Sequence, residues 1–385
     1  MICCIACADP VIPWTDTLEL MYRRGRHGGF DMAVWQSSAG RGVLALAALL
    51  LVQSAHGQAM QQETKSALSI TREDYRGWPD TYRLANGQIE VAVVTAVGPR
   101  IIELKRTGGP NLFHVRAAEA GGHGEPDWVF RGGWRLWIAP ERRATTYVPD
   151  NTRCAAEVLG GTTLRITGPP QPAAGIQKVV DVSLAERDPR VRVVSHIRNV
   201  SDGPLTYAAW SLAVMRPGGR AFAPLDVGPL DAFDATRKLL LWSYAEMSDP
   251  RYRFGDRLVQ IDQSAVRPAP AGQSGRRDDE SKIGVDSSQG WAAYLVDGTL
   301  YLKRFPHDPT GRYPDGGATV EIYSSAEFLE VEQLSPLTTI APGEEIVFPE
   351  EWWVFGDVAV PPNEPAALQT LQPLVDRTAT TWGKD

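Results

Sequence analysis

The strongest constraint on this chain is a long succession of short β-branched and aromatic runs separated by Gly, Pro and Asp turns. The succession extends from about residue 81 to 355 and shows almost no helical periodicity. Many short strands with frequent turns predict an all-β fold, a large antiparallel sandwich. The predicted strands are residues 88–96, 100–105, 162–166, 178–184, 190–198, 205–215, 239–243, 291–296, 299–305, 319–324, 328–333 and 345–355.

Two segments depart from the strand pattern. Residues 266–280 are rich in Pro, Gly and charge and predict a surface loop. Between residues 363 and 377, leucine and valine recur at helical spacing behind a cap at Asn363, which predicts a short C-terminal helix packed on the sandwich. No internal repeat is evident, so one domain is predicted over residues 68–383.

The N-terminal part of the chain predicts export. An apolar run at residues 42–52 is too short to span a bilayer but suits a signal peptide, predicted here at residues 32–57. Residues 1–31 then form an upstream extension, and the true start is predicted at Met32; a retained membrane anchor is the alternative. Three of the four cysteines fall in that extension, so the exported chain keeps Cys154 alone and has no disulfide framework. A periplasmic or secreted protein is expected, without a membrane span once the signal is removed.

The composition of the chain limits the classes of ligand and chemistry that are expected. A net charge of −7 and a pI near 5.5 argue against a nucleic-acid partner. Twelve Trp residues favour a sugar ligand, because indole faces stack on the apolar faces of sugar rings. No familiar nucleophile, phosphate-loop, dinucleotide or metal motif occurs after residue 57, so no cofactor or metal is predicted. Histidine is scarce, and acid–base work would fall to carboxylates. The oligomeric state is not predicted.

Residues 301–332 form the densest group of candidate site residues. Strand alternation places Lys303 on one strand face, Glu321 on a face of the next strand, and Glu330 and Glu332 on a face of the third. If these three faces turn into one hollow, they offer rings for stacking and charged partners for hydroxyl groups. The alternative is the ordinary solvated side of an antiparallel sheet.

A second group lies at residues 131–143, where Gly132 and Gly133 permit unusual backbone geometry. Arg135 and Trp137 follow, with a second indole at Trp134, which fits a ligand rim. The alternative is an aromatic core strand with an exposed charged end.

Several blocks of the chain resemble one family. They include AAWSLAVMRPGGRAFAPL (208–225), LWSYAEMSDPR (241–251), YPDGG (313–317) and FLEVEQLSPLTTIAPG (328–343). These blocks resemble the bacterial galactose-mutarotase-like proteins catalogued as a domain of unknown function, over roughly residues 75–357. The resemblance implies an aldose 1-epimerase-like supersandwich, two large twisted antiparallel sheets with a sugar cleft on one concave face.

The departures from active aldose 1-epimerases bear on catalysis. The resemblance implies a His that protonates the ring oxygen, yet Tyr207, Ala208 and Ala209 stand where that His would fall. A second imidazole is replaced by Trp134, whereas the late carboxylate survives as Glu330 or Glu332. Without both imidazoles, ordinary mutarotation is not expected, because one carboxyl is not a matched acid–base pair.

Two function classes therefore remain open. The first is an exported protein that binds a sugar or sugar acid. The second is a carbohydrate epimerase or lyase that uses a carboxylate, Lys or Tyr in place of the His. Glu330, Glu332 and Lys303 are the candidate catalytic residues. The candidate substrate-binding residues are Arg135, Trp137, Trp210, Arg251, Lys282, Tyr313, Asp315 and Glu321.

Overall fold

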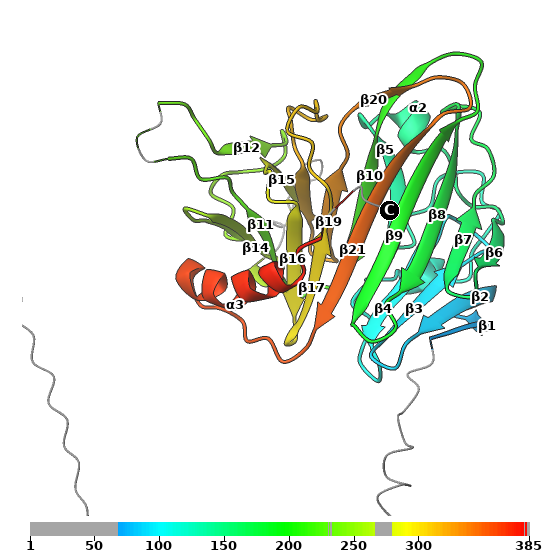
Figure 1. Cartoon of the computed structure of the whole chain (residues 1–385), viewed down its shortest axis with the longest axis horizontal. Coiled ribbons are helices and arrows are strands. Elements are labelled where there is room, and N and C mark those ends of the chain that lie inside the picture. Colours follow the sequence, from blue (N-terminus) through cyan, green and yellow to red (C-terminus); the bar gives the residue numbers. More distant parts are fainter. Residues whose placement is uncertain (1–67, 230, 232, 266–278, 381, 383–385) are drawn as a thin grey trace, which may run out of the picture. The chain divides into compact units, whose positions relative to one another are not determined.

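Two antiparallel β-sheets, packed face to face, make up most of the structure (Figure 1). The computed structural model describes residues 68–229, 231, 233–265, 279–380 and 382, all within the unit Lys65–Asp385. The predicted signal peptide, the predicted start at Met32 and most of the predicted loop at 266–280 lie outside the described residues. None of the described helices is both long enough and apolar enough to cross a membrane.

The first sheet contains eleven of the described strands, with β20 pairing to β10 beside the main path. Its path brings together segments that are far apart in sequence: β5, β10 and β19 are neighbours. In sheet order the strands are β1 (Ser69–Tyr75), β2 (Trp78–Ala85), β3 (Ile89–Val94), β4 (Arg100–Arg106), β5 (Trp134–Ala139), β10 (Leu205–Met215), β19 (Leu329–Leu334), β18 (Val320–Ser324), β15 (Ser281–Asp286) and β12 (Lys238–Leu241), with β20 (Thr338–Ile340) on β10.

The second sheet contains ten of the described strands, and its longest pairings join β9 to β21 and to β8. In sheet order the strands are β13 (Tyr252–Phe254), β14 (Leu258–Asp262), β11 (Arg220–Pro224), β16 (Trp291–Val296), β17 (Thr299–Arg304), β21 (Glu345–Phe355), β9 (Arg190–Asn199), β8 (Ile176–Leu184), β7 (Thr163–Thr167) and β6 (Ala155–Leu159). The short helices are η1 (Ala117–Glu119), α2 (Arg143–Thr146), η2 (Gln263–Ala265) and α3 (Glu364–Arg377).

This architecture confirms the predicted fold class, an antiparallel β-supersandwich with a short C-terminal helix. Each of the twelve predicted strands overlaps an observed one, and the bounds 205–215, 291–296 and 345–355 agree with β10, β16 and β21. Other strands were not predicted. The edge strand β1 is largely polar and exposed, and β13 and β20 are only three residues long, so none shows a clear apolar alternation.

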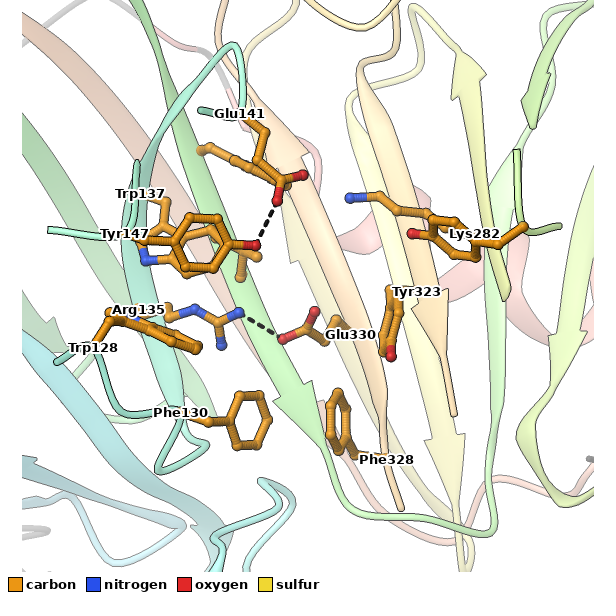
Figure 2. A pocket seen from close by; sticks show the side chains of 13 residues that line it. Trp128, Phe130, Arg135, Trp137, Glu141, Tyr147, Lys282, Tyr323, Phe328 and Glu330 are labelled. Atoms are coloured by element: carbon orange, nitrogen blue, oxygen red, sulfur yellow. Dashed lines mark hydrogen bonds and ion pairs between the residues drawn. The ribbon is translucent and has the colours of Figure 1, made fainter. Parts of the chain in front are cut away.

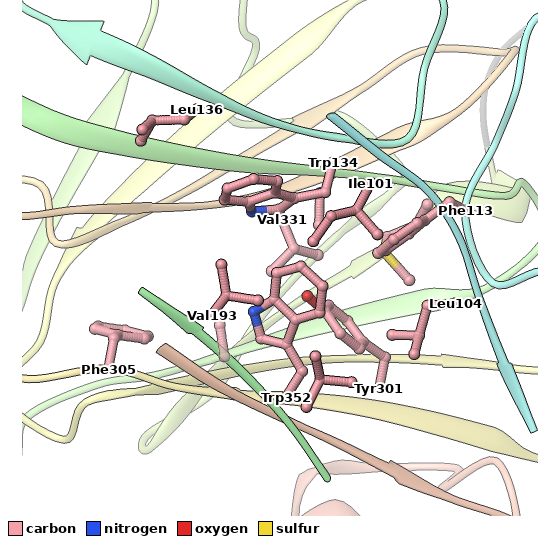
Figure 3. Close-up of a cluster of buried hydrophobic side chains, with 14 of the residues drawn as sticks. Ile101, Leu104, Phe113, Trp134, Leu136, Val193, Tyr301, Phe305, Val331 and Trp352 are labelled. Carbon is pink, nitrogen blue, oxygen red and sulfur yellow. The ribbon is translucent and has the colours of Figure 1, made fainter. Parts of the chain in front are cut away.

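The main core lies between the two sheets and is rich in large aromatic rings (Figure 3). Trp134 of β5 packs against Trp352 of β21, with ring centroids 5.6 Å apart. Phe113 and Tyr301 contact Trp352 edge-on. Burying one such side chain stabilises the fold by roughly 1.5–3 kcal/mol, so these contacts hold the sheets together.

A second core covers the outer face of the second sheet, where α3 packs against β16, β17 and β21. The predicted helix and its cap are confirmed, since the Asn363 side chain accepts a hydrogen bond from the Ala366 N–H at 3.0 Å. At the first turn, the Glu364 carboxylate accepts hydrogen bonds from the backbone N–H groups of residues 256, 257 and 258. Helix α3 is therefore tied to the β13–β14 hairpin as well as to the sheet face.

One prediction about strand faces is wrong. Lys303 does not share a hollow with Glu321 and Glu330, because β17 pairs with β16 and β21 in the second sheet, whereas β18 and β19 belong to the first. Its side chain points between the sheets, where Nζ lies 2.9 Å from Oε1 of Glu350 and 2.9 Å from Oγ of Ser211. Lys303 is fully buried there, so it belongs to the core and not to a ligand face.

Candidate functional site

A pocket of about 170 Å³ opens on the first sheet, on the face that points away from the second sheet (Figure 2). Its floor comes from five strands that are consecutive in the sheet, β5, β10, β19, β18 and β15. The register places Arg135 opposite Leu212, Glu330 opposite Tyr323, and Tyr323 opposite Lys282. Residues directly opposite in antiparallel strands share a face, so the sheet order builds this site from distant segments.

Aromatic side chains form most of the pocket wall. Trp128 and Phe130 precede β5, Tyr147 follows α2, and Trp137 and Trp210 rise from β5 and β10. The rings lie close together: the centroid of Trp137 is 4.8 Å from that of Tyr147 and 5.4 Å from that of Trp210. Such a wall offers flat apolar faces together with indole N–H and phenol O–H groups, which suits an amphipathic ring.

Arg135 and Glu330 form a buried ion pair on the floor, where they point toward one another (Figure 2). Nη2 of Arg135 donates to Oε1 of Glu330 at 2.9 Å. The guanidinium also lies over the Trp137 ring, 4.3 Å from its centroid. Nε and Nη1 of Arg135 have no partner among the described residues, so this cation keeps unused donors.

Lys282 occupies the other side of the floor between two carboxylates. Its Nζ lies 2.7 Å from Oε2 of Glu321 and 2.9 Å from Oε2 of Glu332. Trp210 and Trp242 place their rings 4.6 and 4.7 Å from the same ammonium group. Trp210 also donates from Nε1 to Glu332 Oε2 at 2.8 Å. Lys282 is thus held in place by charge and by aromatic rings.

Burial and these pairings shift the pKa values of the floor residues. Burial raises the pKa of Glu321 to about 8, although Lys282 acts in the opposite direction. Burial also raises the pKa of Glu330, against the attraction of Arg135. For Lys282, burial alone would lower the pKa, but Glu321 and Glu332 raise it well above the usual value. The floor therefore holds carboxyl groups that keep a proton more readily than in water.

The structure brings several predicted site residues together. Arg135, Trp137, Trp210, Lys282 and Glu330 line the pocket, and the expected shared face of the strands at 319–324 and 328–333 is present. Glu321 and Glu332 lie fully buried beneath it, in contact with Lys282.

Other predicted residues lie apart from the lining. Burial raises the pKa of Asp315, which feels the charge of Lys282 without lining the pocket. Arg251 pairs with Asp249 and donates to the Ser324 carbonyl. Tyr313 stacks on His307 and accepts a hydrogen bond from the Asp308 N–H. Trp134, expected at a ligand rim, lies in the main core and donates to Ser211.

Several lining residues were not among the predicted site residues. Apart from Leu212 they are aromatic or acidic side chains, and most of them lie in connections between strands, where no periodicity marks an inward direction. The pair Trp128 and Phe130 just before Gly132-Gly133 was the available signal, since aromatic residues next to a glycine turn often line a site. These residues are Trp128, Phe130, Glu141, Tyr147, Leu212, Tyr244, Tyr323 and Phe328. Glu141 lies within the predicted group at 131–143, and alternation places Tyr323 on the face of Glu321 and Phe328 on that of Glu330.

Metal binding gains no support from side-chain positions. Within the described ranges, no three His, Cys, Asp or Glu side chains gather as a metal site would require. His114 instead lies 3.0 Å from Glu327, and Glu125 pairs with Arg131.

The two sheets and the pocket on the first one define a β-supersandwich protein with a candidate small-ligand site. The chain belongs to the family described as a domain of unknown function (DUF4380), whose profile matches residues 138–355. This match confirms the expectation, drawn from the sequence blocks, of a family catalogued as a domain of unknown function. No curated protein matches the chain.

Several solved structures are similar to the chain at low sequence identity. The Slr1438 protein from Synechocystis sp. PCC 6803 is 13% identical, with a TM-score of 0.48 over 75% of this chain and 99% of that one. A galactose mutarotase-like protein from Lactobacillus casei is 9% identical, with a TM-score of 0.44 over 71% and 100% of the two chains. One from Clostridium acetobutylicum is 11% identical, with a TM-score of 0.45 over 75% and 99%. These similarities are too distant to assign a ligand.

Proposed function

We propose that this protein binds a carbohydrate in the pocket on the first sheet, and that the ligand is a neutral sugar in preference to a sugar acid. The observation that carries the proposal is the pairing of an aromatic wall with a floor of buried, hydrogen-bonding charges. Trp128, Trp137, Tyr147 and Trp210 provide the wall, and Glu330 with Arg135 provides the floor. Sugar rings have apolar C–H faces and hydroxyl edges, which match these two surfaces.

The charges of the floor favour a neutral ligand. Both cations already have carboxyl partners, Glu330 for Arg135, and Glu321 and Glu332 for Lys282. An incoming carboxylate would meet more acidic than basic groups, including Glu141 on the rim. Hydroxyl groups both donate and accept, so they can use the free donors of Arg135 and the open oxygen of Glu330 together.

Binding without turnover fits the site better than catalysis. A catalytic role requires Glu330, Lys303 and Tyr313 to surround one substrate. In the structure, Lys303 lies between the sheets and Tyr313 lies outside the pocket lining. No His is among the residues that line the pocket, so the imidazole of the active epimerases has no substitute there.

The test is a titration of the purified protein with a panel of neutral aldoses and the matching uronic acids, followed by tryptophan fluorescence and calorimetry. We expect saturable binding of at least one neutral sugar and weaker binding of its uronate. Loss of the signal in Trp137→Ala, but not in the distant Trp353→Phe control, would locate the ligand. Uronates that bind more tightly than their neutral counterparts would overturn the choice of ligand class.

A catalytic role is the second candidate, and the raised pKa values of Glu321 and Glu330 are the observation that favours it. A carboxyl group that keeps its proton near neutral pH can act as a general acid. Polarimetry on the sugars that bind distinguishes the two roles: accelerated mutarotation that disappears in Glu330→Gln would establish an enzyme.

We also propose that the protein is exported to the periplasm or beyond, from the apolar run at residues 42–52 and the small residues after it. N-terminal sequencing of the protein from the extracytoplasmic fraction should find Gln58 first. A mature end before residue 50 would contradict this cleavage.

A further inference from the structure

A second pocket, of about 260 Å³, lies away from the proposed sugar site. Three connections surround it: the turn at Gly98-Pro99, the segment after α2 at residues 148–152, and the β7–β8 connection at 168–172. Five prolines stand in its wall, at positions 99, 149, 169, 170 and 172. Proline side chains are apolar and the ring has no N–H, so this wall solvates a charge poorly.

Lys178 of β8 lines this pocket and is only 5% exposed. Its neighbours at alternate positions, Ile176 and Val180, belong to the main core, so its side chain points inward from the second sheet. Among the described residues, no hydrogen bond or ion pair reaches its amine, in contrast to the buried amines of Lys282 and Lys303. A buried amine without a partner is costly in its charged form.

Two charged side chains, Arg100 and Asp150, act on the Lys178 amine in this pocket. Arg100 and Asp150 come from the side of the first sheet and are already paired, with Nη2 of Arg100 3.0 Å from Oδ2 of Asp150. The other oxygen of Asp150, Oδ1, and Oε1 of Gln171 have no hydrogen-bond partner. Burial lowers the pKa of Lys178 to about 8, Asp150 opposes this, and Arg100 and Arg135 add to it. A substantial fraction of the amine is therefore neutral near physiological pH.

We propose that this pocket is a second ligand site, in which the amine of Lys178 captures a small aldehyde as an imine. The neutral nitrogen attacks the carbonyl carbon and forms a carbinolamine. The carbon–oxygen bond then breaks, and water leaves with both protons of the amine, so that one aldehyde and one amine give one imine and one water. Amines in apolar pockets beside another cation are activated for this reaction, and Lys178 lies in such a pocket with Arg100 nearby.

The test uses the intact protein, glycolaldehyde as the probe and borohydride to reduce and fix the imine. Peptide mass spectrometry should locate the reduced adduct at Lys178 before any other lysine is labelled. The labelling rate should rise with a midpoint near pH 8, and Lys238, half exposed at the surface, is the reference lysine for comparison.

Two variants serve as controls for this test, together with a comparison between Lys178 and other lysines. Lys178→Met removes the nucleophile and should abolish the selective adduct, and Thr152→Trp, at the exposed mouth of the pocket, should slow labelling while Lys178 is kept. Neither residue lines the sugar pocket, so sugar titrations should be unchanged in both variants. Labelling of Lys178 no faster than that of Lys105 and Lys238, or equally fast labelling in Thr152→Trp, would overturn the proposal and leave the sugar-site proposal unaffected.

Discussion

Lys282 and Lys303 are both buried lysines held by glutamate, yet they serve opposite regions of the molecule. Lys282 lies on the ligand face of the first sheet between Glu321 and Glu332, and its pKa is raised well above the usual value. Lys303 lies between the sheets with Glu350 alone, and burial lowers its pKa despite that partner. Burial acts to lower the pKa of both amines, and only at Lys282, where two carboxyl groups lie close, do the neighbours outweigh burial. Lys282 and its partners lie on the polar face of the first sheet at the candidate pocket, whereas Lys303 and Glu350 pair in the core between the sheets.

The largest expected effect is in the core. Glu350→Ala leaves the Lys303 ammonium buried without its carboxylate, and we expect the free energy of unfolding to fall by about 3–5 kcal/mol. Urea unfolding followed by far-ultraviolet circular dichroism measures this loss. The matched double variant Lys303→Met with Glu350→Leu should recover most of it, because no charge remains unpaired. If the folded fraction of Glu350→Ala also lost sugar affinity, the core between the sheets and the pocket face of the first sheet would not be independent.

The next effect is on the ligand face. Glu330→Gln keeps the shape of the side chain but removes its charge, so the affinity for a bound sugar should fall by about 1.5–3 kcal/mol, or roughly 10- to 150-fold. Calorimetric titration measures the change. Glu327→Gln is the control, because Glu327 pairs with Arg116 and His114 outside the pocket lining. An equal loss in both variants would show that general charge, and not Glu330, determines affinity.

A smaller effect concerns pH. Because the pKa of Glu321 is about 8 in the folded protein and near 4.5 when unfolded, the folded state binds the extra proton between these values. The stability that this group contributes is complete below about pH 4.5 and is lost as the pH rises through 8. Urea unfolding from pH 5 to 8.5 should show a fall of at least about 1.4 kcal/mol, the equivalent of one pKa unit.

Glu321→Gln is the matched variant for that measurement, since glutamine resembles the protonated carboxyl. Its stability should vary less over the same pH range than that of the parent protein. A steeper fall in the variant would mean that Lys282 keeps Glu321 ionised and that the burial of Glu321 has little effect on its pKa.

The smallest effect is at Trp128. Its Nε1 donor is buried without a partner, so Trp128→Phe should change the free energy of unfolding by no more than about 0.5 kcal/mol. Sugar affinity should nevertheless fall by about 0.5–1.5 kcal/mol if a ligand oxygen accepts from this N–H. Thermal unfolding measures the change in stability, and titration of the same preparation measures the change in sugar affinity. Unchanged affinity would place the ligand on the other side of the pocket, near Lys282.

The positions of Lys282 and Lys303 also show how much of the site the sequence could predict. Alternation correctly gave the faces of Glu321 and of Glu330 and Glu332, because the direction of a side chain in a strand is a local property. It could not show that β17 lies in the other sheet, because the chain crosses between sheets in the connection from β17 to β18. Sheet membership is decided by pairing with β21, which follows some fifty residues later in the chain.

The strands and the cap of α3 were predictable for the same local reason, since apolar alternation and an Asn before a proline act within a few residues. The aromatic wall of the pocket was not predictable from the sequence. Trp128 and Tyr147 lie in connections, and their direction depends on which strands are neighbours in the finished sheet.

The attachment of α3 has a consequence for the order in which the molecule forms. Glu364 binds the backbone of residues 256–258, more than a hundred positions earlier, so these N–H groups gain their carboxylate partner only when α3 docks. Until then Leu300, Leu302 and Phe355 have no cover on that side of the second sheet. We expect docking of the helix to follow the main folding barrier, so that Leu371→Ala accelerates unfolding more than it slows refolding in stopped-flow experiments. Detachment of the helix alone would therefore expose apolar side chains of the second sheet while the main core between the sheets stays intact.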